Sequence, residues 1–219
     1  VNELAVRLEN ENESSRWYPG AGLYRNVHLV VTEDAYVPTW GTHVTTPVIN
    51  EKYAKVVLNT KLATAKGADR SAYRIVTEIK DPNGKVVAKE ENKLSVFNEC
   101  QFEQEFAVAT PALWSVENPF LYTAESKIYA GNTLKDEYTT RFGIRTLEII
   151  PEKGFFLNGK LTKFKGVCNH HDLGPLGAAV NDAAIRRQIR IMKDMGVNAI
   201  RTSHNMPAPE LVEACDEMG

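Results

Sequence analysis

The sequence has few cysteines, no long apolar run and almost no net charge, and each absence excludes a class of protein. Its three cysteines, Cys100, Cys168 and Cys215, are too few and too widely spaced for a disulfide framework, so we expect buried free thiols. No apolar stretch approaches the roughly 20 residues that a helix needs to cross a bilayer. A formal net charge of −2 gives no electrostatic basis for binding nucleic acid or an anionic membrane surface.

Common catalytic and cofactor motifs are also missing. There is no Gly-x-Ser-x-Gly elbow, and Ser203 and His204 are adjacent, which prevents the hydroxyl from meeting the ring in triad geometry. No nucleotide-binding glycine motif is present, since residues 174–179 have the wrong spacing. His170 and His171 would point to opposite faces of a strand and could not readily share an ion. The sequence therefore predicts no metal site and no cofactor, while a Mg or Na ion in a longer protein is left open.

The first two thirds of the chain alternate between apolar and polar residues, as β-strands do. Leu4, Val6 and Leu8 show this period of two near the start, and residues 26–31 form another strand-like run. Five further strand-like runs follow with short breaks between them: 53–65, 72–80, 85–96, 100–108 and 121–129. Short strands at this spacing, with no helical pattern among them, predict an antiparallel β-sandwich.

Two dipeptides suit tight hairpin turns between these strands. Asn83-Gly84 fits a type I′ turn, in which both central residues have positive φ, and Gly131-Asn132 is the second candidate. The sandwich is expected over residues 33–147, about the size of one immunoglobulin-like domain.

After Pro151 the pattern changes to alternating strands and helices. Residues 154–169 indicate a hairpin followed by a strand over 161–168, and a second strand is expected over 197–202. An amphipathic helix is predicted over 181–196 and another helix over 207–219. This order indicates parallel strands joined by crossover helices. Because two such units cannot complete a barrel or a doubly wound sheet, we expect the chain to be an internal fragment of a longer protein.

The first of these helices carries its own start and stop signals. Asn181 or Asp182 can cap its N-terminus, and Gly196 stands where a left-handed residue ends a helix. The second helix, over 207–219, likewise has proline near its first turn.

Polar clusters follow both predicted parallel strands. The first strand ends in residues 169–172, Asn-His-His-Asp, and the second in residues 201–205, Arg-Thr-Ser-His-Asn. Ligands of parallel α/β folds sit beyond the carboxyl ends of the strands, so these clusters predict one polar-ligand site. Arg201 is costly to bury unless it is paired. It either makes a salt bridge in the scaffold or holds an anionic catalytic group.

Several motifs resemble family 2 glycoside hydrolases, which include β-galactosidases, β-glucuronidases and β-mannosidases. The opening of that family's catalytic barrel is similar to residues 157–160, 165–172, 192–205 and 215–219. The end of its immunoglobulin-like domain and the start of its barrel resemble residues 112–129 and 142–149. The last strands of its N-terminal jelly-roll domain resemble residues 14–30.

The resemblance implies a mostly β chain in three parts. Residues 1–32 would be the C-terminal strands of a jelly-roll sugar-binding domain, and residues 33–147 the immunoglobulin-like β-sandwich. Residues 148–219 would be the N-terminal part of a TIM-barrel catalytic domain, comprising the first two β/α units of a (β/α)8 barrel.

The resemblance also implies a retaining β-glycosidase in which two glutamates perform the chemistry. The family places both at later barrel strands, beyond Gly219, so the chain contains neither catalytic residue and is expected to be inactive alone. Glu210 and Glu217 are interpreted as solvated helix charges. Residues 169–179 look most like β-galactosidases of gut-type anaerobic bacteria and favour β-galactosides as the glycan bound. A β-glucuronidase or β-mannosidase is the alternative within the family.

What carries over to this chain is the sugar cradle. His170 and His204 match histidines that face the sugar, and Arg201 matches an arginine that contacts the nucleophilic carboxylate. Asp172 and Asn205 are assigned to the same substrate-binding set. Many relatives have Asn-Arg-His-Glu or Asn-Lys-His-Glu where this chain has Cys168-Asn169-His170-His171-Asp172, which shifts the acidic position by one.

Ser15 and Arg16 are assigned to the rim of the site. Some large β-galactosidases have an aspartate two residues before the jelly-roll tryptophan, where this chain has Ser15-Arg16-Trp17. A bacterial periplasmic or secreted location is favoured over the cytoplasm. The unfinished barrel is expected to make the chain self-associate.

A second class of function is a non-catalytic carbohydrate-binding or interaction module. Such a module would align exposed aromatic residues on one sheet face. Tyr53, Tyr73, Phe97 and Phe102 are instead spread over several predicted strands, and core packing explains them more simply.

Overall fold

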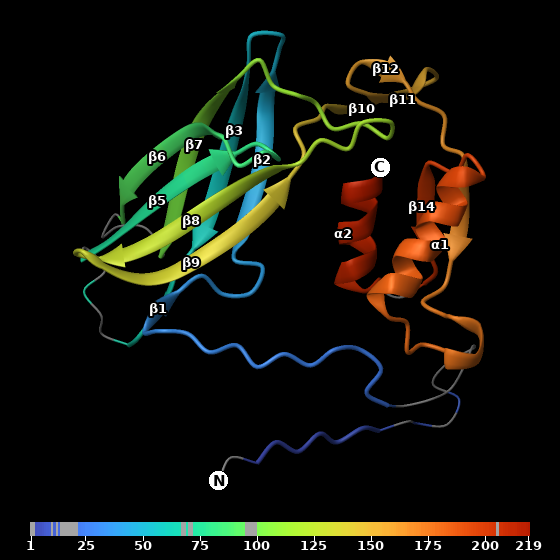
Figure 1. The fold of residues 1–219 in the computed structure, drawn as a ribbon, viewed down its shortest axis with the longest axis horizontal. Helices are drawn as coiled ribbons and strands as arrows, with labels where there is room; N and C mark the ends of the chain where they lie inside the picture. Colours follow the sequence, from blue (N-terminus) through green and yellow to red (C-terminus); the bar gives the residue numbers. More distant parts are fainter. Residues whose placement is uncertain are drawn as a thin grey trace.

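The computed structural model describes residues 3–9, 11, 13, 22–66, 69, 72–94, 100–204 and 206–219. Figure 1 shows a β-sandwich beside a smaller unit of strands and helices, with an extended N-terminal stretch that runs below both in this view. The elements are β1 (Ala35–Tyr36), β2 (Thr42–Ile49), β3 (Tyr53–Lys61), β4 (Ala63–Thr64), β5 (Tyr73–Lys80), β6 (Val86–Lys93), β7 (Gln101–Ala109), β8 (Tyr122–Ala130), β9 (Thr133–Phe142), β10 (Leu147–Ile150), β11 (Gly154–Leu157), β12 (Lys160–Leu161), β13 (Gly166–Asn169), η2 (Gly174–Leu176), α1 (Asp182–Asp194), β14 (Ala199–Thr202) and α2 (Pro209–Met218).

The predicted antiparallel β-sandwich is confirmed. One sheet has the order β2-β3-β7 and the other β6-β5-β8-β9, with antiparallel pairing throughout. Two of these strands, β2 and β9, were not predicted. β2 contains Pro47, and its register with β3 shifts between Thr45 and Val48, while β9 buries only Phe142. Both lie at sheet edges, where a strand needs little apolar alternation to be stable.

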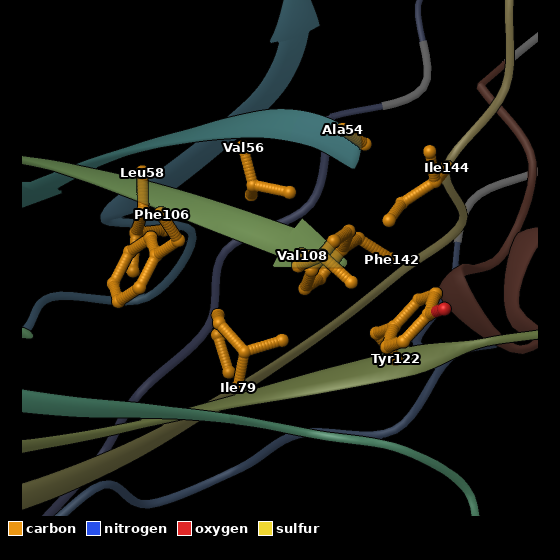
Figure 2. Packing of buried hydrophobic residues seen from close by; sticks show 10 residues of the cluster. Ala54, Val56, Leu58, Ile79, Phe106, Val108, Tyr122, Phe142 and Ile144 are labelled. Carbon is orange, nitrogen blue, oxygen red and sulfur yellow. The ribbon is translucent and has the colours of Figure 1, made fainter. Parts of the chain in front are cut away.

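The sandwich core follows from the alternation of β3, β5, β7 and β8. Each strand turns every second side chain inward, and those positions are buried. Figure 2 shows Leu58, Ile79 and Phe106 from three of these strands meeting between the sheets. Burying an apolar side chain of this size stabilises the fold by roughly 1.5–3 kcal/mol.

A layer of buried polar side chains divides the core into two apolar clusters. Thr77 of β5, Gln104 of β7 and Ser126 of β8 form this layer, whereas Thr60 of β3 is also buried but pairs with Phe102, two residues along β7 from Gln104. The Thr77 hydroxyl donates to Gln104 Oε1 at 2.6 Å and lies 2.9 Å from Ser126 Oγ, and the Gln104 amide donates to Asn92 Oδ1 at 3.0 Å. The first apolar cluster contains Val56, Leu58, Ile79 and Phe106, and the second contains Tyr73, Ile75, Phe102 and Ile128. Tyr73 and Phe102 are therefore core residues, as expected.

Both predicted hairpins form, but the type I′ geometry at Asn83-Gly84 is wrong. Only Gly84 has positive φ, at 80°. The carboxylate of Asp81 accepts from the backbone N–H groups of Asn83 and Lys85 at 2.9 and 3.0 Å, and this side-chain turn replaces the I′ conformation. In the β8–β9 hairpin, likewise, Gly131 has a φ of 59°.

The strands expected in the N-terminal stretch are not observed. Residues 3–9 and 22–33 are extended without strand pairing, and Leu4 and Leu29 are 82% and 91% exposed. Alternation alone does not make a strand, because no segment among the described residues supplies a hydrogen-bonding partner. The assignment of residues 1–32 to a jelly-roll domain stays a prediction.

The C-terminal part starts with a three-stranded sheet, β10-β11-β12, and continues with the parallel pair β13 and β14. The hairpin predicted near residue 154 is confirmed. The strand expected over 161–168 is shorter, however, because residues 160–161 belong to the hairpin and β13 begins at Gly166. β14 likewise begins at Ala199 rather than at residue 197.

Both helices are present, with the expected ends. The Asn181 side chain accepts from Ala184 N–H at 2.9 Å and caps α1. Gly196, at φ 85°, donates to the Lys193 carbonyl, and Val197 donates to the Met192 carbonyl, which is the Schellman pattern. α1 and α2 pack through a small apolar cluster: Ile185, Ile189, Ala208, Leu211 and Ala214.

Trp114 joins the sandwich to α2. Its indole N–H donates to the Asp216 carbonyl at 2.7 Å, and the Arg145 guanidinium lies 4.7 Å from the ring centroid. A Cβ atom at Gly143 would lie 2.7 Å from Trp114 Cβ, so the close approach needs glycine there. The orientation of the helical unit therefore depends on a contact with the sandwich.

Replacing Gln104 by leucine should lower the free energy of unfolding by about 1–3 kcal/mol, because the Asn92 side chain and Thr77 hydroxyl each lose a partner in the core. Chemical denaturation measures this, and Gln101→Leu, an exposed change on the same strand, is the control. Equal stability of the two variants would contradict an energetic role for the polar layer.

Candidate functional site

The parallel pairing of β13 with β14 brings the two polar clusters to one edge. Gly166 pairs with Ala199 and Asn169 with Thr202, so the strands end level with each other. The Ser203 N–H extends the ladder by donating to the Asn169 carbonyl at 2.9 Å. His170 follows β13 and His204 follows β14, so the backbones of these two residues lie near each other at this edge.

His170 and His204 face each other at this edge. Their ring centroids are 5.9 Å apart with an interplanar angle of 87°, an edge-to-face arrangement. Both side chains are exposed, so their ring nitrogens are accessible to a ligand. Two imidazoles in this position can donate hydrogen bonds to hydroxyl groups of a sugar.

Arg201 lies beside this pair, at the end of β14. Its Nη1 donates to Ser203 Oγ at 2.9 Å and lies 4.0 Å from Sγ of Cys168, the residue it pairs with in the ladder. Within the described part of the chain no carboxylate forms an ion pair with it, so the scaffold salt bridge considered above is not observed there. The exposed guanidinium can bind an anionic group.

The cysteines are free, as expected, but they are not fully buried. Cys168 is exposed at the strand edge, and Cys100 and Cys215 are half-buried. Cys168 alternates outward because its neighbour Val167 takes the inner position on a four-residue strand.

Asp172 closes a tight turn after His170. Its N–H donates to the His170 carbonyl at 2.9 Å, and its own carbonyl accepts from Gln188 Nε2 of α1 at 3.2 Å. The helix thus holds the backbone of this loop, and Asp172 itself is half-buried. Its contact with a sugar hydroxyl stays a prediction.

His171 packs on the N-terminal stretch, whereas His170 makes the ring contact with His204. It is half-buried against Tyr24, with ring centroids 5.8 Å apart, and its Nε2 is buried without a hydrogen-bond partner. Burial lowers the pKa of His171, and the nearby positive charge of Arg25 lowers it further, although a hydrogen bond to the Ala178 backbone acts in the opposite direction. His171 therefore favours its neutral form.

Three consecutive N-terminal residues contact the two loops of the site, and the sequence reasoning missed them. Arg25 donates to the carbonyls of Met206 and Pro207, the second at 3.3 Å, and Asn26 Nδ2 donates to Glu210 Oε1 at 3.2 Å. Tyr24 packs on His171. In the sequence these residues stand out only by a single arginine within Gly-Leu-Tyr-Arg-Asn-Val, residues 22–27. A lone arginine does not reveal a contact with Pro207, 182 residues later in the chain.

Three predicted site residues lie outside the described residues: Ser15, Arg16 and Asn205. Their assignment to the rim and to the sugar cradle stays a prediction.

Glu217 is not the solvated helix charge that was expected. It forms ion pairs with Arg186 and Arg141, the first at 2.5 Å, and these hydrogen bonds lower the pKa of its carboxyl. Arg141 lies on β9, so the pairing adds to the junction between the sandwich and α2. Glu217 therefore pairs with one arginine of α1 and with one arginine of β9.

No group of three or more metal-ligating side chains occurs in the part of the chain that the structure describes. None of the helices there is long and apolar enough to span a membrane.

Comparison with known proteins gives two family matches in chain order. The profile of Glycosyl hydrolases family 2 matches residues 36–145, and that of the TIM barrel domain of Glycosyl hydrolases family 2 matches residues 149–219. The chain is 45% identical, over its whole length, to the β-galactosidase BoGH2A of Bacteroides ovatus, of which it covers 26%. It is 38% identical, again over its whole length, to a putative β-glucuronidase of Formosa agariphila, of which it covers 20%.

Solved structures show the same similarity. A crystal structure of a glycosyl hydrolase family 2 member from Bacteroides cellulosilyticus superposes with a TM-score of 0.88 at 39% identity, covering 96% of this chain and 29% of that one. The chain thus spans between a fifth and three tenths of the length of these relatives.

The lowered pKa of His171 predicts a pH dependence of stability. Because the folded state binds this proton less readily than the unfolded state, the free energy of unfolding should fall as the pH falls below 6.5 and be unaffected by His171 above it. Histidine-selective NMR should place the titration midpoint of His171 below 6.5. His171→Gln should weaken the pH dependence of denaturant unfolding. A midpoint above 6.5 would contradict the burial argument.

Proposed function

Because the chain belongs to family 2 of the glycosyl hydrolases, we propose that the protein carrying it is a retaining β-glycosidase that hydrolyses terminal β-D-galactosides. The observation that carries this proposal is the exposed pair of His170 and His204, 5.9 Å apart at the carboxyl edge of two parallel barrel-type strands. The similarity to a β-galactosidase over the whole chain supports galactose as the sugar.

In this proposal the chain supplies the sugar cradle. The two imidazoles donate to sugar hydroxyls, and these bonds strengthen as positive charge develops on the sugar ring in the transition state. Asp172 and Asn205 complete the hydrogen bonding, with Ser15 and Arg16 at the rim. The bond is broken by two glutamates about 5 Å apart, which the family places at later barrel strands.

Arg201 has a separate role in this scheme, because its planar guanidinium suits a carboxylate better than a hydroxyl. It holds the nucleophilic carboxylate ionised and oriented, and its bond to Ser203 Oγ fixes the position of its own end group. Ser203 is buried, which makes it a firm anchor. The proposed reaction needs no cofactor or resident metal. Whether the longer protein binds a Mg or Na ion is left open by this proposal.

A second candidate is a β-glucuronidase, favoured by the 38% identity to a protein with that printed name. The two candidates share the barrel chemistry and differ in the group at the sugar's C6 position, a hydroxymethyl in galactose and a carboxylate in glucuronate.

A panel of nitrophenyl β-galactoside, β-glucuronide and β-mannoside tests the assignment on the purified full-length protein. We expect kcat/KM to be highest for the galactoside, while preference for the glucuronide would select the second candidate. The absence of turnover on all three substrates would refute the proposal. Turnover by the 219-residue chain alone would refute the expectation that this chain is inactive by itself.

Arg201→Ala and His204→Ala should each lower kcat/KM of the full-length protein by roughly 10²–10³-fold, because each removes a group that stabilises charge in the transition state. Thermal unfolding should change little, since both side chains are exposed. Arg187→Ala, an exposed change on α1, is the matched control and should leave the rate unaltered. Near-wild-type rates in the first two variants would contradict their roles.

Self-association of the 219-residue chain is also part of the proposal. Large apolar side chains are exposed on the C-terminal unit: Leu147 (58%), Ile149 (80%), Leu161 (60%) and Phe164 (61%). A patch of this kind favours association. Analytical ultracentrifugation should show a weight-average mass that rises with concentration, and a monomer at all concentrations would contradict the expectation.

A further inference from the structure

The N-terminal stretch touches both loops that carry the candidate sugar contacts. Figure 1 shows it crossing from the sandwich toward the C-terminal unit. Tyr24, Arg25 and Asn26 make their contacts there, although the stretch forms no strand in the described residues. We refer to these three residues as the N-terminal clamp.

Arg25 is the central member of the clamp. Its guanidinium donates to two consecutive carbonyls, those of Met206 and Pro207, in the segment between β14 and α2. This segment contains His204, which is exposed and whose ring lies edge-to-face with that of His170. A fork of two donors on adjacent carbonyls fixes the direction of the chain as well as its distance.

The neighbours of Arg25 hold the elements on either side of that segment. Tyr24 packs on His171 in the loop after β13, with ring centroids 5.8 Å apart, and the Arg25 guanidinium lies 5.2 Å from the Tyr24 ring centroid. Asn26 donates to Glu210 in the first turn of α2 at 3.2 Å. One short stretch therefore holds both loops relative to each other.

We propose that Arg25 is a positioning residue for the sugar site, holding the segment after β14 so that His204 stays opposite His170. Tyr24 does the same for the loop after β13 by packing on His171. This inference rests on the proposed function for its kinetic consequences, but not for the loop geometry. Misplacing a substrate-positioning group by about 1 Å can cost on the order of 10²-fold in rate.

The kinetic test uses the full-length protein and the galactoside. Arg25→Ala should lower kcat/KM by roughly 10–100-fold, mostly through kcat, because the histidine contact matters most in the transition state. Millimolar guanidinium should restore part of the rate in Arg25→Ala, and Arg25→Lys should restore less than the native residue because lysine lacks the fork. Arg7→Ala, at an exposed arginine of the same stretch, is the control and should neither lose activity nor respond to guanidinium.

Hydrogen exchange gives a readout that does not need activity. Peptides covering residues 203–210 and 170–178 should exchange faster in Arg25→Ala than in the wild type, with the sandwich unchanged, and Arg7→Ala should match the wild type. Tyr24→Leu supplies a second variant, expected to affect mainly residues 170–178, should Arg25→Ala fail to fold.

The two proposals fail in different ways. A wild-type protein without glycosidase activity would refute the proposed function, and hydrogen exchange would still test the clamp. An active wild type with Arg25→Ala within twofold of its kcat/KM, and with unchanged exchange at 203–210, would overturn the inference. A uniform rise in exchange over the whole protein, without rescue by guanidinium, would overturn it in favour of a general stabilising role.

Discussion

The hydrogen-bonded parallel register between β13 and β14 is the constraint on which the site depends. It makes two strands end level, so that His170, Arg201 and His204 gather although the last two lie more than 30 residues from the first along the chain. Antiparallel pairing would have placed the two polar clusters at opposite ends of the pair. The edge is polar because His170 and His204 follow the ends of the two strands and Arg201 lies near the end of β14.

The β-sandwich contributes to the same site from a distance. Two apolar clusters with the polar layer between them form its core, and Trp114 and Arg141 connect the sandwich to α2. α2 in turn packs on α1, whose Gln188 holds the loop after β13. The loop after β13 is therefore supported through a continuous series of contacts that begins in the sandwich.

Much of the fold could be predicted because its signals are local. Alternation identified β3, β5, β7 and β8, and cap residues identified both ends of α1. The same rule failed for residues 3–9, since alternation does not provide a pairing strand, and it missed β9, whose side chains are mostly polar. The two polar clusters were found from the rule that ligands sit beyond parallel strand ends. The roles of Tyr24 and Arg25 could not be found, because contacts across the length of the chain leave no periodic trace in the sequence.

The contact of Arg25 with Pro207 joins residues 182 positions apart, and this separation has a consequence for biosynthesis. At about 5–20 residues per second, a ribosome needs roughly ten seconds or more to make the second partner after the first. During that interval the sandwich between them can fold, which shortens the effective loop that the contact must close. The contact between Arg25 and Pro207 is thus closed only after the segments on both sides of the sandwich have been made. The loop that carries His204 gains this restraint when the two segments meet.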